Sequence, residues 1–523
     1  VAKDFTVRKL YTQRGTASLE KPMATKVSVS LPVCCSTASR PRPDHKDSLS
    51  VLAGAVKRIA SRTHTLTHKR ARKIRRYAAR HIQKLFPRLE QGEILEPEEW
   101  IDQINHPEKR KAELRIVLEE MRAQQLTRDK MLETGSFVKD EGYDSCKPLR
   151  WINASDDQMK ILFGPYCDAI MHKMCKNPAF IKVVPVKDRA KAIFDGLYVE
   201  GGIYHAADYT SYEAHFERLK MQISHDFFRY MTESCNISDQ LDWSNLGMLS
   251  KALDLLMSER VMKMKGFGTI SIIGRRMSGE MDTSLSNTYT NFVMVNFMCF
   301  YKSGGRITTT PCFVEGDDSV TRYPEGIDPT EEDFAKFGWV IKMERHTDIS
   351  RMSFCGLIFD PDDLVVVCDP VIAIAKFGWT GRRYVRASHA LLMNLLRSKA
   401  LSMCCEYGQV PILGALARRV LKLTQHVTIR QSVINQMEQY KRDQFLTYLK
   451  TPKPWAIPFQ PPIKTRILVE EMYGVTVEKQ CSIERDMENL RLAPFGVDLP
   501  FPPQLVHNMT RVYKSDQEML YPT

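Results

Sequence analysis

The sequence of 523 residues lacks the long apolar runs and ligand spacings that mark several protein classes. Its longest apolar run, 291–301 (NFVMVNFMCFY), is about half of the ~20 residues that a spanning helix needs, so we expect no transmembrane segment. The 13 cysteines form no CxxC pair and no His/Cys zinc spacing, which is typical of a reduced, intracellular protein. Neither GxxxxGK[ST] nor GxSxG occurs, so the sequence does not indicate a P-loop helicase or a serine hydrolase.

Core-building and basic residues are plentiful. Hydrophobic residues make up 43% and charged residues 26%, the balance of a globular protein with several lobes. The formal net charge of +13 favours a polyanionic partner, either nucleic acid or an anionic membrane. The chain starts at Val1 without a charged-then-apolar signal sequence, so we expect a cleaved product, a readthrough portion or a fragment.

Periodicity predicts the outline of an α/β protein. The first fifty residues are expected to be irregular, and 57–88 to form a basic amphipathic helix that contacts RNA or membrane phosphates, or equally is a solvated face. Further predicted elements are helices within 97–132, a strand at 203–208, helices at 212–231 and 281–300, hairpins at 307–314/319–322 and 353–359/364–368, and helices up to about 449. From Thr451 a Pro-rich segment is expected to wrap over the surface.

Three aspartates fall at strand ends. Asp317 and Asp318 follow Gly316 at the tip of the first hairpin, and Asp208 ends the strand at 203–208. Adjacent carboxylates repel each other and are retained most readily beside a cation, although an Asp-Asp pair alone is more often turn chemistry. If the two strands are neighbours in one sheet, Asp208 and Asp317 could bridge two Mg²⁺ ions about 3.5–4 Å apart.

A polar segment lies between these acids in the sequence. Ser278-Gly279 predicts a flexible loop opening a helix, on which Thr283 and Asn287 share one face. Such a wall suits a ribose 2′-hydroxyl, while a polar helix N-terminus facing solvent is the alternative.

The order DYTSYE at Asp208, SGEMDTSLSN at Ser278 and GDD at Gly316 resembles motifs A, B and C of the viral RNA-dependent RNA polymerases. RRMSGEMDTSLSN is most similar to the tombusvirus-like branch of positive-strand viruses. The resemblance covers about 136–420. It implies a right-hand polymerase fold, with fingers, an antiparallel-sheet palm (an α+β unit) and a mostly helical thumb.

The resemblance also implies roles for the motif residues. Asp208, Asp317 and Asp318 would hold two Mg²⁺ ions, with Mn²⁺ as the alternative. The second acid of motif A helps to select ribose in the family, and here that position is Glu213, a departure from the usual Asp. The motif B candidates are the loop Ser278-Gly279, for contact with template and incoming base, and Thr283 and Asn287, for contact with the sugar.

Three further segments resemble family motifs. SFVKDEGYDSCKPLRWI resembles motif F, which makes Lys139, Arg150 and, behind them, Lys147 the candidates for binding the triphosphate. FAKFGWVIKMERH resembles motif D, whose lysine protonates pyrophosphate; Lys342 is chosen over Lys336. SFCGLIF resembles motif E, the grip on the primer strand, with Cys355 expected to pack.

The implied organisation and partners complete the expectation. The expected parts are 1–130 as an N-terminal extension with the basic helix and part of the fingers, 131–200 as fingers with motif F, 201–228 as palm with motif A, 229–270 as fingers, 271–370 as palm with motifs B to E, 371–450 as thumb, and 451–523 as a Pro-rich C-terminal tail. Partners would be template and nascent RNA, nucleoside triphosphates, and viral or host replication proteins in a replication complex of the host cytoplasm. Membrane association would come only through partners or the basic helix.

Two other function classes were weighed against this one. A reverse transcriptase typically carries an aromatic-x-Asp-Asp motif, whereas this chain has Glu315-Gly316 before the two acids. A viral RNA-binding or packaging protein without enzymatic activity would be expected to have a basic arm before a β-rich shell, and the helix-rich second half opposes that reading.

Overall fold

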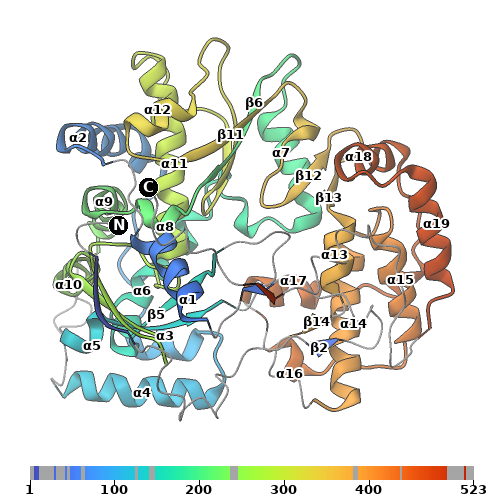
Figure 1. The fold of residues 1–523 in the computed structure, drawn as a ribbon, viewed down its shortest axis with the longest axis horizontal. Helices are drawn as coiled ribbons and strands as arrows, with labels where there is room; N and C mark the ends of the chain where they lie inside the picture. Colours follow the sequence, from blue (N-terminus) through green and yellow to red (C-terminus); the bar gives the residue numbers. More distant parts are fainter. Residues whose placement is uncertain are drawn as a thin grey trace.

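The computed structural model describes residues 5–10, 29–30, 42–43, 47–60, 65–123, 128–139, 148–235, 246–264, 266–377, 379–380, 384, 387–435, 437, 439–491 and 512–513. The fold is mixed α/β, as the sequence predicts, with several small sheets among many helices (Figure 1). Within the described part of the chain, no helix is both long and apolar enough to cross a membrane.

The elements follow the chain in this order. The helices are α1 Ser48–Ala55, α2 His68–Tyr77, α3 Pro97–Gln103, α4 Glu108–Arg122, α5 Arg128–Leu132, α6 Asp157–Met174, α7 Arg189–Leu197, α8 Tyr212–His215, α9 Arg218–Thr232, α10 Leu246–Leu256, α11 Thr283–Lys302, α12 Glu331–Lys336, α13 Pro370–Phe377, α14 His389–Glu406, α15 Leu413–Leu423, α16 Gln431–Ile434, α17 Gln439–Leu449, α18 Ile463–Tyr473 and α19 Val477–Glu488. The strands are β1 Phe5–Leu10, β2 Val29–Ser30, β3 Arg42–Pro43, β4 Glu133–Val138, β5 Trp151–Ser155, β6 Tyr204–Tyr209, β7 Glu259–Met264, β8 Gly268–Ile273, β9 Cys312–Glu315, β10 Asp318–Arg322, β11 Ile341–His346, β12 Leu357–Asp360, β13 Val365–Cys368, β14 Trp379–Thr380 and β15 Val512–Tyr513.

A four-stranded antiparallel sheet has the strand order β11-β6-β10-β9. Alternate residues of a strand face opposite sides, so β6 contributes to two cores. Tyr204 and Ala206 pack with α7 and the β12–β13 hairpin, whereas Ala207 and Tyr209 join the large core that contains α11. The predicted strand at 203–208, the hairpin around Gly316 and the hairpin before Cys368 are confirmed.

Helix α11 is buried almost all round, although it carries several polar side chains. Every residue from Leu285 to Cys299 is buried, which fits a helix enclosed by other elements rather than an amphipathic surface helix. It packs against β9 and β10 on one side and against α2 and α9 on the other. The helix therefore fixes the position of the β9–β10 hairpin relative to the helices around it.

A five-stranded sheet has the order β1-β8-β7-β4-β5 and covers α1. All its pairings are antiparallel except β4 with β7. Strand β1 corrects the expectation of an irregular first segment, because Phe5–Leu10 pairs with β8. Its sequence, FTVRKL, lacks a clean alternation of apolar and polar residues, so the local pattern did not identify it.

The basic segment is helical from His68 to Leu85, through α2 and the short helical turns that follow it, but the single helix predicted over 57–88 is not continuous, because 65–67 are not helical. Ile74, Tyr77 and Ile82 are buried in the large core, whereas Leu85 is 41% exposed.

Helices α13 to α19 surround a separate core (Figure 1). After the Pro-rich segment at 451–462, which was expected on the surface, α18 and α19 contribute Leu468, Val469 and Ile483 to this core. The prolines of 451–462 all precede α18, and Pro462 is the residue that caps its first turn, where a proline does not disrupt helical hydrogen bonds.

Candidate active site at the edge of the four-stranded sheet

Three adjacent strands bring charged side chains into one row. In the β11–β6 pairing Lys342 lies directly opposite Asp208. In the β10–β6 pairing Ser319 lies opposite Ala207, so one residue further along this register Asp318 stands across from Asp208. Opposite residues of antiparallel strands share a face, and the row Lys342, Asp208, Asp318 therefore crosses the sheet. The sequence-based condition that the strands of Asp208 and of the Asp-Asp hairpin be neighbours is met.

The turn that carries Asp317 is held by α11. Gly316 adopts a φ of +63°, which favours glycine. Its N–H donates to Thr288 Oγ1 at 2.9 Å, and the fully buried Asn291 donates from Nδ2 to the carbonyl oxygens of Gly316 (3.2 Å) and Asp318 (3.0 Å). Sequence reasoning missed Thr288 and Asn291, although Asn291 follows Asn287 by one helical turn.

The acids raise one another's proton affinity. Burial, and next the charge of Asp208, raises the pKa of Asp317 to about 6. Burial, followed by the charges of Asp317 and Asp208, raises the pKa of Asp318 to about 7. Burial also raises the pKa of Asp208, against the opposing charge of Lys342. Burial and mutual repulsion therefore both favour the protonated form of these acids.

Two arginines that sequence reasoning did not select lie beside the acids. Arg58 forms an ion pair with Glu213 at 3.5 Å, and its charge opposes the rise in the pKa of Asp208. Arg189, the first residue of α7, forms an ion pair with Glu315 at 3.3 Å. The only signal for Arg58 was its membership of the basic segment.

Cys355, which was expected only to pack, has polar surroundings. Its Sγ–H donates to Glu315 Oε2 at 3.8 Å, and burial, followed by the charge of Asp318, raises the pKa of the thiol. A thiol kept protonated in this way is a hydrogen-bond donor at the acidic site rather than a nucleophile.

Within the described residues, no three His, Cys, Asp or Glu side chains form a ready-made metal site. The chemistry of the donor set nevertheless fits a hard divalent cation. Asp208, Asp317 and Asp318 offer only carboxylate oxygens, which both Mg²⁺ and Mn²⁺ accept. Burial first, and then repulsion among the acids, raises the pKa values of Asp317 and Asp318, and a cation between them would offset both effects.

The Ser278-Gly279 loop rests on β5. The N–H of Asn153 donates to Ser278 O at 2.6 Å. Gly279 has a φ of +107°, and a Cβ there would lie 3.0 Å from Ile152 Cγ2. The loop is thereby placed against the strand that starts directly after Arg150.

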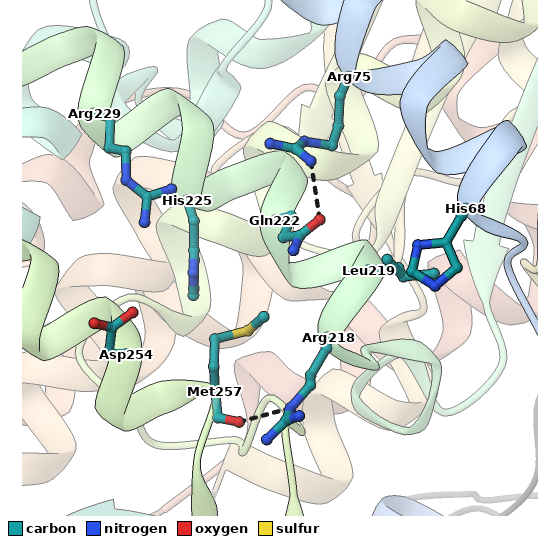
Figure 2. Close-up of a pocket in the computed structure, with 9 residues that line it drawn as sticks. All are labelled: His68, Arg75, Arg218, Leu219, Gln222, His225, Arg229, Asp254 and Met257. Carbon is teal, nitrogen blue, oxygen red and sulfur yellow. Dashed lines mark hydrogen bonds between the residues drawn. The ribbon is translucent and has the colours of Figure 1, made fainter.

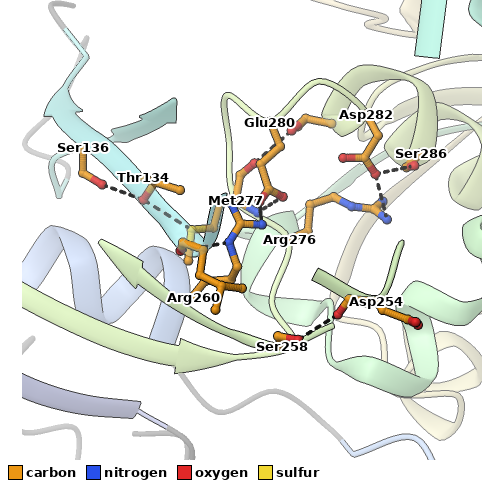
Figure 3. A network of polar contacts seen from close by, with 12 residues as sticks. Thr134, Ser136, Asp254, Ser258, Arg260, Arg276, Met277, Glu280, Asp282 and Ser286 are labelled. Atoms are coloured by element: carbon orange, nitrogen blue, oxygen red, sulfur yellow. Dashed lines mark hydrogen bonds and ion pairs between the residues drawn. The ribbon is translucent and has the colours of Figure 1, made fainter. Parts of the chain in front are cut away.

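The two predicted sugar-binding side chains make internal hydrogen bonds. Thr283 Oγ1 donates to Met277 O at 2.8 Å, and Asn287 Oδ1 accepts from Arg276 at 3.1 Å. Arg276 is fully buried and also donates to Ser224 Oγ at 2.8 Å. Figure 3 shows Arg276 beside Asp282 in the polar network around this loop.

Of the predicted phosphate ligands, Arg150 lies close enough for its charge to act on the acids, because it opposes the rise in the pKa values of both Asp208 and Asp317. The N–H of Lys139 donates to Arg150 O at 2.8 Å, which places these two candidates side by side. Lys147 lies outside the described residues.

The two lysines of 334–346 differ in their surroundings. Lys336 donates to Asp333 Oδ1 at 2.9 Å, whereas Lys342 is exposed and faces Asp208. Lys342 is therefore the one beside the acids.

No protein-family model matches the chain, and no curated protein matches it in sequence.

Proposed function

We propose that this chain is a viral RNA-directed RNA polymerase, which adds nucleotides to an RNA 3′-hydroxyl under the direction of a template and releases pyrophosphate. One observation carries the proposal. Asp208, on β6, meets Asp317 and Asp318, which follow it by more than a hundred residues, at one end of the strands of the four-stranded sheet, and Lys342 lies opposite Asp208. In the corresponding right-hand fold, the four-stranded sheet is the palm, the five-stranded sheet belongs to the fingers, and the helices after β13 form the thumb.

The three aspartates are the residues that would hold two Mg²⁺ ions, or Mn²⁺ as the alternative. When bound, such ions activate an attacking hydroxyl and stabilise a leaving phosphate. Lys342 lies on the same face as Asp208, where its ammonium group can give a proton to the departing pyrophosphate. Arg150 and Lys139 then bind the triphosphate, Arg150 through paired N–H donors.

Sugar selection in this proposal belongs to Glu213, Thr283 and Asn287. Glu213 Oε2 is buried without a hydrogen-bond partner among the described residues, apart from its ion pair with Arg58. An incoming ribose hydroxyl would supply the missing donor. Asn287 must exchange its bond with Arg276 to reach the same sugar, so Arg276 acts as a positioning residue for it.

RNA binding by this enzyme would be electrostatic and tolerant of sequence. Base pairing with the template reads the sequence, while basic side chains contact backbone phosphates. Affinity should therefore fall as salt rises. The proposed setting is a replication complex of the host cytoplasm, with viral or host replication proteins as further partners.

Primer extension on a short RNA template tests the proposal. The parent, Asp317→Asn and the control Asp362→Asn, an exposed turn aspartate after β12, are compared with Mg²⁺ and with Mn²⁺. Loss of metal-ion stabilisation is worth several kcal/mol, so Asp317→Asn should slow extension by at least about 10²-fold while the control extends normally. Equal extension by all three would contradict the site. A folded parent that binds RNA and extends nothing with either metal would favour the RNA-binding or packaging alternative.

A further inference from the structure

A basic pocket of about 620 Å³ opens between α2, α9 and the end of α10 (Figure 2). It shares no lining residue with the acidic site. Its main lining side chains are His68 and Arg75 from α2, Arg218, His225 and Arg229 from α9, and Met257 after α10. A cavity of this size is in the range that takes a small ligand.

One face of α9 lines the pocket, and side-chain hydrogen bonds from α2 hold it in place. Arg218, Gln222, His225 and Arg229 follow the spacing of one helical face, and Figure 2 shows them on successive turns of α9. Arg75 joins α2 to this face, because its guanidinium donates to both oxygens of Asp226 (2.6 and 2.8 Å) and to Gln222 Oε1 at 3.0 Å. The pocket therefore does not depend on a loop for its shape.

Positive charge exceeds negative charge around the pocket. Arg75, Arg218 and Arg229 are opposed by Asp226, which pairs with Arg75 and lies 3.7 Å from Arg229, and by Asp254. Arg218 donates from Nε to Met257 O at 3.0 Å. Its two terminal nitrogens donate no hydrogen bond to another residue of the described ranges. A guanidinium edge of this kind matches a phosphate bidentately.

His225 supplies a second, independent indication of a ligand. The residue is 2% exposed, and its Nε2 has no hydrogen-bond partner among the described residues. Burial, with the charges of Arg276 and Arg229, lowers the pKa of His225 to about 3, so the ring is neutral and can form one further bond as donor or acceptor. A buried polar atom without a partner is costly, and a bound ligand would satisfy it.

We propose that this pocket binds the phosphate group of a nucleotide, with Leu219 and Met257 against its sugar or base. The phosphate lies against Arg218 and Arg229, and the ring of His225 bonds the ligand at the buried end of the pocket. The phosphate comes either from a free nucleoside triphosphate or from the end of an RNA strand. The inference does not depend on polymerase activity.

Binding to the intact protein in EDTA tests this, because chelation removes metal-dependent binding at the acidic site. The probes are GTP, guanosine and a short 5′-phosphorylated RNA. Arg218→Gln/Arg229→Gln is compared with Arg72→Gln/Arg76→Gln, which removes the same charge from exposed positions of α2 outside the pocket. Thermal unfolding of each variant checks that the fold is intact.

The pocket variant should weaken GTP binding at least about tenfold, the value of one charge-assisted hydrogen bond, while the α2 control matches the parent. Guanosine should bind at least about tenfold more weakly than GTP for the same reason. RNA that displaces GTP more effectively than unlabelled GTP does would identify an RNA end as the source, and the reverse order would identify the free nucleotide. Equal affinity of parent and pocket variant, equal affinity for GTP and guanosine, or no saturable binding would each overturn the proposal.

Discussion

Asn291→Ala removes both hydrogen bonds that α11 donates to the turn containing Asp317. The carbonyl oxygens of Gly316 and Asp318 lose their bonds to Nδ2, and a small cavity remains in a fully buried position. Each lost bond contributes about 0.5–1.5 kcal/mol, and the cavity adds to this, so we expect the free energy of unfolding to fall by about 2–4 kcal/mol.

Asn296→Ala provides a matched control on the same helix. Asn296 is equally buried, donates from Nδ2 to Phe292 O at 2.8 Å and accepts from the N–H of Thr310 at 2.8 Å. Its Nδ2 also donates to Cys312 Sγ at 3.8 Å, at the start of β9. This variant therefore loses three hydrogen bonds and a similar volume without touching the turn at Gly316. The two variants should be destabilised alike, and they should differ at the acidic site.

Urea unfolding measures the stability of both variants, and hydrogen exchange read by mass spectrometry measures the mobility of the turn at 315–319. Exchange in this turn should accelerate in Asn291→Ala and stay at the parent rate in Asn296→Ala. Primer extension should fall about 10²-fold in Asn291→Ala alone, since a displacement of about 1 Å has that effect on a positioned site. Identical exchange and extension in the two variants would refute the holding role of Asn291. A difference in exchange without extension by the parent would leave that role intact and count against the polymerase proposal.

Three further changes test the surroundings of the site. Glu280→Ala leaves the fully buried Arg260 without the carboxylate that lies 2.6 Å from its guanidinium, so the free energy of unfolding in urea should fall by about 3–5 kcal/mol. Arg260→Met/Glu280→Leu removes both charges and should lower it much less; equal losses would contradict the ion-pair argument. Burial lowers the pKa of Lys220 from 10.5 to about 7, so between pH 7 and 10.5 the unfolded chain binds more protons than the folded one, and the free energy of unfolding should rise with pH. Lys220→Met should flatten that rise, and the same dependence on pH in parent and variant would refute the lowered pKa of Lys220. Gly279→Ala should cost about 1–3 kcal/mol because of the positive φ and the approach to Ile152, so an unchanged melting temperature would speak against the close packing of this loop.

Local patterns predicted the elements that carry the acids. Each of three predicted elements is found, because its own residues show the pattern of a strand, a turn or a helix: the buried strand at 203–208, the hairpin around Gly316 and the long helix after Ser278. The placement of Asp208 beside the hairpin followed from a single condition, the adjacency of two strands, which the sheet order meets.

Long-range contacts were beyond those patterns. Arg58 and Arg189 lie at the acidic site only because segments distant in sequence fold against the sheet edge, and nothing in their own neighbourhoods encodes that. Asn291 was missed because a buried amide in a buried helix is indistinguishable by period from a packed core position. The helices after Thr451 were missed because the prolines that precede them dominate the local signal.

The order β11-β6-β10-β9 also constrains when the acidic site can form during synthesis. Strand β6 emerges from the ribosome long before either of its neighbours, which begin at Asp318 and Ile341. Until then, Asp208 sits on a strand with two unpaired edges, and closing such long loops is slow. A nascent chain that ends before β11 therefore lacks the strand that carries Lys342, and one that ends before β10 lacks the three-carboxylate cluster altogether.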